Sequence, residues 1–397
     1  MKRHVIYIPG YDPRPPEAAF SFFQNEIARY GDVRDVACTL EVTKGLDEGD
    51  PLYALWQARS NQSGNTVNTD LYFINWRDLV LREFQLSGFM RVLLGFLTFA
   101  HMAFSGYYYR LYQRHLHSTL FWAYPPIFFA ILVSAILFPL GLLVEMVSWQ
   151  DYRQSAPAMM GLVLWPLAVY RGSWLLERHT YFWYLTNDCI SIRRYSLDKD
   201  TALRERLKSA GQLILQIHEN AAPEDEVIVL GHSSGSMLVI DALHEALCIK
   251  PDLGTAGARI RCLTLGSAFN YFCGFSGSTK LRTAIATLAV NRAIHWRDVY
   301  ASEDIICNGK FPSLQDFTRK RALSKNEGPE QQRTRITASL TPERYRALWG
   351  KVFNMHFCYL VASDNPGYFD LYDELLGFKE ATADESKELA LTASQTH

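Results

Sequence analysis

The sequence lacks a CxxC pair, and its seven cysteines are scattered and odd in number. This spacing predicts neither a zinc site nor a disulfide framework, so free thiols in a reducing compartment are the expected state. A surplus of charge is absent as well, since 40 basic and 41 acidic residues leave a net charge of −1. The charge balance therefore gives no reason to expect nucleic acid or an acidic substrate as a partner.

The N-terminus is not expected to act as a signal peptide, because its apolar stretch is short and ends at Pro9-Gly10. Hydrophobic residues make up 48% and charged residues 20% of the 397, which suffices for a large core in two or three domains. The polar tail, 379–397, is expected to be mobile.

Charge is also missing from a long apolar run, 119–144, whose 26 residues include no Asp, Glu, Lys, Arg or His. Because about 20 apolar residues cross a bilayer core, this run predicts a transmembrane helix. A second charge-free stretch, 154–170, lies at the short end of the spanning range. A third, 92–109, follows Arg91 and contains His101.

The residues around these stretches follow a pattern typical of membrane proteins. Aromatic residues that fit interface belts lie near the ends of the first two: Trp122, Tyr124, Trp149, Trp165, Tyr170 and Trp174. The link 145–153 contains Glu145, Asp151 and Arg153, whereas the outer flanks contain Arg110, Arg114, Arg171 and Arg178. By the positive-inside rule the flanks, and the domain attached to them, face the cytoplasm.

If both ends of the chain build one domain, the number of crossings is even. We expect two, at roughly 119–147 and 154–176, which form a transmembrane hairpin over 119–178. The segment 81–118 is then an amphipathic interfacial helix, with Arg82, Arg91, Arg110 and Arg114 near the headgroups. A pairing of 92–109 with 119–144 is an alternative, and a buried helix of the soluble domain is another for 92–109.

Outside this block, short apolar strands alternate with helices. Strands are predicted at 4–10, 70–76, 226–231, 260–266 and 293–300, and helices at 16–31, 201–219, 235–248 and 342–353. This alternation predicts an α/β fold with a doubly wound, mostly parallel sheet. Its two parts are 1–80 and 179–378, and the membrane block is inserted between them.

The strand 226–231 runs directly into Gly231-His232-Ser233-Ser234-Gly235 and then a helix. A serine at such a sharp turn adopts a strained backbone that lifts its hydroxyl clear of the sheet edge. The flanking glycines remove clashes where strand and helix approach closely. Strand, Gly-x-Ser-x-Gly and helix match the nucleophile elbow, which makes Ser233 the candidate nucleophile. The alternative is a tight turn with a buried, hydrogen-bonded serine.

In these residues the chain resembles the lipase and esterase branch of the α/β-hydrolase superfamily, over its first strands and last 200 residues. That resemblance implies the order Ser, acid, His. After residue 300 the histidines are His356 and His397, and the latter lies in the polar tail, so His356 is the expected base. A core histidine is the alternative. Asp304 is the expected acid, with Glu303 next and Asp298 also open. Ile305 stands where the family usually has proline.

Similar enzymes also hold the oxyanion with two main-chain amides. Gly10 and the Tyr11 amide fit one position, and the Ser234 amide fits the other. His232 is expected to pack beside the elbow rather than act as a base. The resemblance thus implies a serine hydrolase of carboxylic esters or thioesters that needs no cofactor or metal. The predicted membrane hairpin adds an anchor in the bilayer, and its location beside the site favours an apolar or acyl-lipid substrate.

Two other function classes remain open at this point. The same fold can serve as a catalytically silent membrane scaffold, although the intact Ser, acid and His order disfavours this. A channel or transporter is disfavoured because the charge-free run has no intramembrane ionisable residue to mark a pathway. The stretch 313–340 is a lid or, given its charge and polarity, a slack surface loop.

Overall fold

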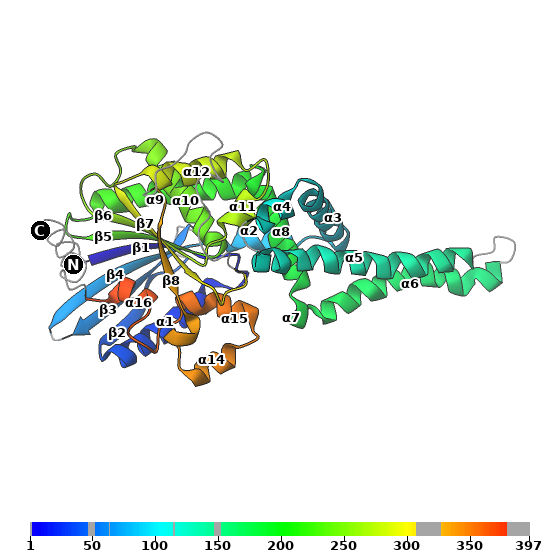
Figure 1. The fold of residues 1–397 in the computed structure, drawn as a ribbon, viewed down its shortest axis with the longest axis horizontal. Helices are drawn as coiled ribbons and strands as arrows, with labels where there is room; N and C mark the ends of the chain where they lie inside the picture. The colour runs from blue at the N-terminus through cyan, green and yellow to red at the C-terminus, as the bar shows by residue number, and fades with distance from the viewer. Residues whose placement is uncertain are drawn as a thin grey trace, which may run out of the picture.

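The computed structural model describes residues 2–46, 52–62, 64–113, 116–146, 152–306 and 327–378. These residues form an eight-stranded sheet in the order β2-β3-β4-β1-β5-β6-β7-β8 (Figure 1). The strands are β1 (Lys2–Ile8), β2 (Ala37–Lys44), β3 (Tyr53–Gln62), β4 (Asn65–Ile74), β5 (Glu226–His232), β6 (Arg259–Leu265), β7 (Ile294–Ala301) and β8 (Glu330–Thr334). The predicted α/β class with a mostly parallel sheet is confirmed.

The parallel part runs from β4 through β1, β5, β6 and β7 to β8, while β2, β3 and β4 form an antiparallel edge. The strands β2, β3 and β8 were not predicted. β8 falls within 313–340, which was predicted to be a lid or a loop. Residues 330–334 of that stretch instead form a strand that pairs with β7. Residues 313–326 of that stretch, like the tail 379–397, lie outside the described residues.

Helices cover both faces of the sheet, and β5 shows why. Val227 and Val229 of β5 pack into a core with α9 (Thr201–Asn220), α10 (Ser234–Ile249) and α12 (Thr279–Val290). Ile228 and Leu230 pack on the other face with α1 (Pro16–Arg34) and α16 (Leu371–Leu376). Because successive side chains alternate across a strand, β5 is apolar throughout and both faces are buried.

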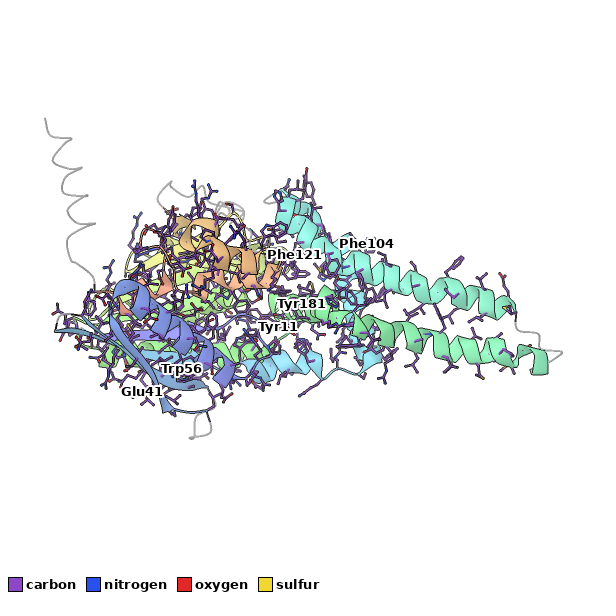
Figure 2. All side chains as sticks on the ribbon, turned by 90° about the horizontal axis from the view of Figure 1, so that it is seen from below. Tyr11, Glu41, Trp56, Phe104, Phe121 and Tyr181 are labelled. Carbon is purple, nitrogen blue, oxygen red and sulfur yellow. The ribbon has the colours of Figure 1, made fainter. Side chains whose placement is uncertain are left out.

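Two long helices, α5 (Leu116–Glu145) and α6 (Tyr152–Leu175), run side by side away from this body (Figures 1 and 2). Trp165 of α6 donates a hydrogen bond from Nε1 to the Ala135 oxygen of α5, 2.9 Å away. Of the described helices, α5 alone is long and apolar enough to cross a membrane, and α2 with α3 passes only as a pair bent by 102°.

The base of α5 differs from the prediction. Trp122 was expected at a membrane interface, but it is 2% exposed and packs on Tyr271, with ring centroids 4.6 Å apart. Phe129 is buried as well, so the first turns of α5 belong to the protein core. The predicted crossing at 119 therefore begins too early, because an apolar run alone does not distinguish core from lipid. Trp149 and Asp151 lie outside the described residues.

The segment 81–118 is broken into α2 (Arg77–Phe84), α3 (Gly88–Phe104) and α4 (Tyr107–Tyr112). Three of its arginines, which were expected near lipid headgroups, have partners within the protein. Arg82 pairs with Asp200, Arg91 is buried and donates to the Phe84 oxygen, and Arg110 donates to the Gly274 oxygen. Arg114 lies outside the described residues. Most of the exposed residues of α3 are large and apolar: Phe89, Met90, Leu93, Phe96, Leu97 and Phe104.

The C-terminal part adds short elements near the ends of the parallel strands. The single helix predicted over 342–353 is two helices, α14 (Pro342–Leu348) and α15 (Val352–His356). Gly350 between them has φ +77°, which a continuing helix does not allow. Upstream, α7 (Glu177–Thr180) and the largely buried α8 (Phe182–Ser196) connect α6 to α9.

Candidate active site

Ser233 lies between β5 and α10 in a backbone conformation that is rare for residues with a side chain. Its φ is 57° and its ψ is −127°. Its amide donates to the Leu265 oxygen of β6, 3.0 Å away, and so anchors the turn to the neighbouring strand. The Ser236 hydroxyl donates to the Ser233 oxygen at 2.5 Å and accepts from the Ala268 amide at 3.0 Å. Strain of this kind persists only where the surroundings fix it, and it is typical of functional sites.

Three glycines permit this turn. A Cβ added at Gly231 would lie 2.7 Å from the main-chain carbon of Gly235, and one at Gly235 would lie 2.7 Å from the Pro9 oxygen. Both separations are shorter than atoms tolerate. A Cβ at Gly10 would lie 3.0 Å from Cβ and 3.5 Å from Oγ of Ser233. The loop after β1 therefore runs directly beside the Ser233 side chain, as the sequence predicted for Gly10.

His356, the last residue of α15, is buried beside Asp304, which follows β7. Its Nδ1 lies 2.7 Å from Oδ2 of Asp304, whose Oδ1 accepts from the Ile306 amide at 3.0 Å. Because Asp304 accepts at Nδ1, that nitrogen carries the proton and Nε2 is the basic atom. The buried Nε2 has no hydrogen-bond partner among the described residues. It is available to a further group.

The other two candidate acids lie elsewhere. Glu303 accepts hydrogen bonds from Ser302 and Thr337 at the surface. Asp298 is fully buried in β7 and accepts from the Thr264 hydroxyl at 2.7 Å, and burial raises its pKa to about 7. Of the three carboxyl groups, that of Asp304 is the one bonded to the His356 ring.

Ser233 and His356 line the same small cavity, of about 50 Å³. Gly10, Tyr11 and Ser234 line it as well, so the structure brings the predicted nucleophile, base and oxyanion loop together. Ser234 begins α10, whose N-terminus directs amide groups and partial positive charge toward this space. The arrangement can activate a hydroxyl and stabilise an oxyanion.

Among the residues of this cavity that were not predicted from the sequence are Trp122, Tyr184 and Asp188. Tyr184 and Asp188 belong to α8, and the Tyr184 hydroxyl donates to the Tyr11 oxygen at 2.5 Å. A signal for α8 exists in the polar Thr186-Asn187-Asp188 run between apolar residues, because polar residues in a buried helix need a partner or a role.

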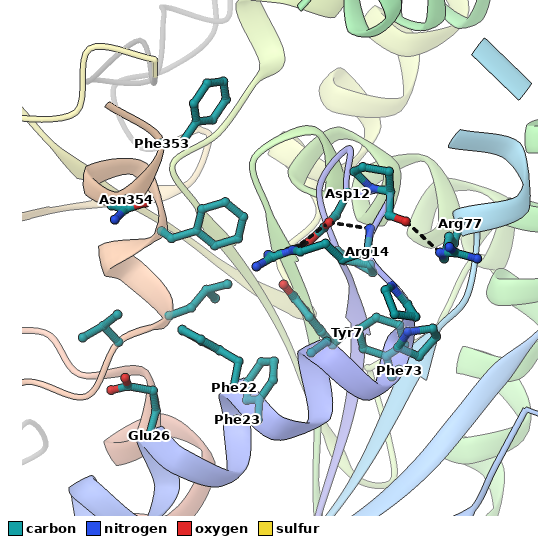
Figure 3. Close-up of a pocket in the computed structure, with 18 of the residues that line it drawn as sticks. Tyr7, Asp12, Arg14, Phe22, Phe23, Glu26, Phe73, Arg77, Phe353 and Asn354 are labelled. Carbon is teal, nitrogen blue, oxygen red and sulfur yellow. Dashed lines mark hydrogen bonds and ion pairs between the residues drawn. The ribbon is translucent and has the colours of Figure 1, made fainter. Parts of the chain in front are cut away.

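A second cavity, of about 650 Å³, adjoins the first. Tyr7, Tyr184, Phe353 and Phe357 border both. Figure 3 shows Phe22, Phe23 and Glu26 of α1 across from Phe353 and Asn354 of α15. Arg14 reaches between them and is bonded to Asp12, while Arg77 donates to the Pro13 oxygen at 2.7 Å. Most of the walls are aromatic, leucine, valine or proline side chains.

Comparisons with models of known protein families, with curated proteins and with solved structures found no match. The described residues contain no group of three or more His, Cys, Asp or Glu side chains that could hold a metal ion. The geometry of the chain itself is therefore the basis for a functional proposal.

Proposed function

We propose that the protein is a membrane-anchored serine hydrolase of the α/β-hydrolase fold that cleaves a carboxylic ester or thioester. One observation carries the proposal: His356, bonded to Asp304, shares a cavity with Ser233, which lies at a strained, glycine-flanked turn. The Ser233 hydroxyl thus combines a strained backbone, closely packed glycines on both sides, and a buried carboxyl–imidazole pair in the same cavity.

In the proposed reaction, Ser233 Oγ attacks the substrate carbonyl carbon while His356 Nε2 takes the hydroxyl proton. The resulting oxyanion is stabilised by the amides of Tyr11 and Ser234. Asp304 holds the imidazole and stabilises its cation. His356 then gives the proton to the departing alcohol or thiol, which leaves an acyl-serine. Water, deprotonated by His356, attacks that acyl group; His356 then gives this proton to Ser233 Oγ as the bond to the acyl carbon breaks, which releases the acid and restores free Ser233 and neutral His356. The absence of a Ser233 bond to Nε2 is compatible with this sequence, since such bonds often tighten only with substrate.

The helical hairpin supports a membrane location and an apolar substrate. Only 6% of the most apolar 18-residue stretch of α5 is buried in the protein. Both helices expose large apolar side chains, such as Ile131 and Leu137 of α5 and Val163 of α6. The part of α5 beyond Phe129 is about 24 Å long at the helical rise per residue. A helix of that length reaches through most of a bilayer's hydrocarbon core, which is about 30 Å thick. The base of the same helix lines the Ser233 cavity through Trp122.

Labelling with a fluorophosphonate probe tests the proposal, because such probes react with activated serines. We expect labelling of the full-length protein that is lost in Ser233→Ala and strongly reduced in His356→Ala. Glu303→Gln is the control, since the Glu303 carboxylate is bonded to Ser302 and Thr337 at the surface, and it should label like the wild type. Labelling that survives Ser233→Ala would refute the assignment, and no labelling at all would favour a scaffold.

A further inference from the structure

The cavity that Ser233 lines contains a carboxyl group that the proposed reaction does not use. Asp188 of α8 is 8% exposed and lines this cavity. Its Oδ1 is buried and has no hydrogen-bond partner among the described residues. A buried, unbonded polar atom is unfavourable unless something else satisfies it. A bound molecule in the cavity can supply that partner.

The protonation state of Asp188 narrows the chemistry of this partner. Burial, and to a smaller extent the nearby Glu83 carboxylate, raise the pKa of Asp188 to about 8. At neutral pH the group is then mostly an uncharged acid, which can both donate and accept a hydrogen bond. A hydroxyl group matches this ability. A substituted ammonium group gains little, because there is no full negative charge to attract it.

The sizes of the two cavities indicate which one takes the acyl chain of an ester and which one takes its alcohol portion. The cavity with Ser233 and Asp188 has about 50 Å³, whereas the adjoining, mainly apolar cavity has about 650 Å³. A water molecule needs roughly 10–15 Å³ on this measure, so the smaller cavity accepts only a few non-hydrogen atoms. The larger one has room for an extended chain. An acetyl methyl group beside Asp188 would leave the carboxyl unsatisfied, which disfavours the reverse orientation.

We propose, on the basis of the function proposed above, that Asp188 binds a hydroxyl of a small alcohol portion of the substrate while a long acyl chain occupies the larger cavity. The substrate class is then an ester of a fatty acid with a small polyol. Asp188 contacts substrate and sets specificity for the leaving alcohol, and the transferred proton still comes from His356.

Two matched esters test this inference on the full-length protein. The decanoyl monoester of ethylene glycol and decanoyl propyl ester differ by one hydroxyl in place of one methyl group. We expect kcat/KM to be at least about tenfold higher for the glycol ester, since a site built to bind a hydroxyl rejects the analogue that lacks it. The variant Asp188→Leu should lose this preference, whereas Asp188→Asn, which still donates and accepts, should keep most of it.

The possible failures are distinguishable. Equal kcat/KM for the two esters with the wild-type protein would overturn the role of Asp188, with no variant needed. A preference that survives in folded Asp188→Leu would overturn it too. Faster hydrolysis of decyl acetate than of the decanoyl glycol ester would overturn the orientation. Failure to hydrolyse any ester, together with no fluorophosphonate labelling, would instead refute the proposed function, and this inference with it.

Discussion

The ring of His232 lies beside the ring of His356, with centroids 4.7 Å apart, and its Nε2 donates to the main-chain oxygen of His356 at 2.9 Å. The residue that precedes the candidate nucleophile therefore fixes the backbone of the candidate base. His232 is a positioning residue, as its expected place beside the elbow suggested. Its ring is 1% exposed and lies against a second imidazole, and both features disfavour its charged form.

This relationship predicts a pH dependence of stability. Burial, and then the neighbouring His356, lower the pKa of His232 to about 3. In the unfolded chain a histidine has a pKa of about 6.5, so the unfolded state takes up the proton first. The free energy of unfolding therefore falls as the pH drops from about 6.5 toward 3, by up to about 1.4 kcal/mol per pH unit. Chemical unfolding at several pH values measures this slope.

Replacing the ring isolates its contribution. His232→Gln keeps a donor for the His356 oxygen but does not titrate, so we expect a shallower loss of stability below pH 6.5. His179→Gln is the matched control, because His179 is exposed, and it should keep the wild-type slope. Identical slopes for the wild type and His232→Gln would contradict the account of this residue.

The pairing of Asp304 with His356 predicts a selective loss of turnover. In Asp304→Asn the amide no longer stabilises the imidazolium and favours the wrong tautomer, so kcat should fall by up to about 10⁴-fold with little change in KM. Steady-state kinetics on a short acyl ester measure both constants. Glu303→Gln should keep wild-type kinetics. A larger loss of kcat in Glu303→Gln than in Asp304→Asn would show that Asp304 is not the acid.

The close approach of strand, loop and helix predicts that the elbow tolerates no added methyl group. Gly235→Ala would place its Cβ 2.7 Å from the Pro9 oxygen, so strand and helix must separate. We expect a loss of about 1–3 kcal/mol in the free energy of unfolding and a large loss of activity. Gly367→Ala, at a position with nothing within 4 Å, serves as the control for both measurements. Unchanged activity in Gly235→Ala would contradict the packing.

The larger cavity predicts a dependence on acyl chain length that can be altered by filling it. Ala19 of α1 lines that cavity. Ala19→Trp should lower kcat/KM for a decanoyl ester much more than for an acetyl ester, because only the longer chain needs the filled volume. Gln24→Trp, exposed on the same helix, should leave the ratio between the two esters at its wild-type value. An equal reduction for both esters in Ala19→Trp would place the acyl chain elsewhere.

The hairpin predicts membrane binding that depends on its exposed apolar residues. Ile131 and Leu137 of α5 are both 60% exposed, and a lysine deep in a bilayer costs about 2.5–3.5 kcal/mol. The double variant Ile131→Lys, Leu137→Lys should bind phospholipid vesicles much more weakly in a flotation assay. Ile249→Lys, at the exposed end of α10, is the control. Equal flotation of the double variant and the wild type would refute insertion of the hairpin.

The sequence predicted those parts of the fold that have a local pattern. β5 and the elbow were found because a continuous apolar strand runs directly into Gly-x-Ser-x-Gly. β2 and β8 were not, because most of their residues are only partly buried or exposed and show no apolar run. The first turns of α5 were predicted to lie in the membrane because the apolar sequence around Trp122 suits a protein core and a lipid environment equally well.

The candidate site divides in the same way. His356 follows from elimination among the histidines, but the choice of Asp304 over Glu303 and Asp298 depends on which carboxyl the turn after β7 directs inward. No local pattern encodes that direction. Asp188 was missed because its significance lies in the cavity that it shares with Ser233, although it precedes Ser233 by 45 residues (233 − 188) in the sequence.

Hydrolysis of a short acyl ester by the purified full-length protein tests the central claim most directly. We expect turnover by the wild type, none above background in Ser233→Ala, and a loss of several orders of magnitude in His356→Ala, each with wild-type thermal stability to within a few degrees. Turnover that persists unchanged in folded Ser233→Ala would contradict the account.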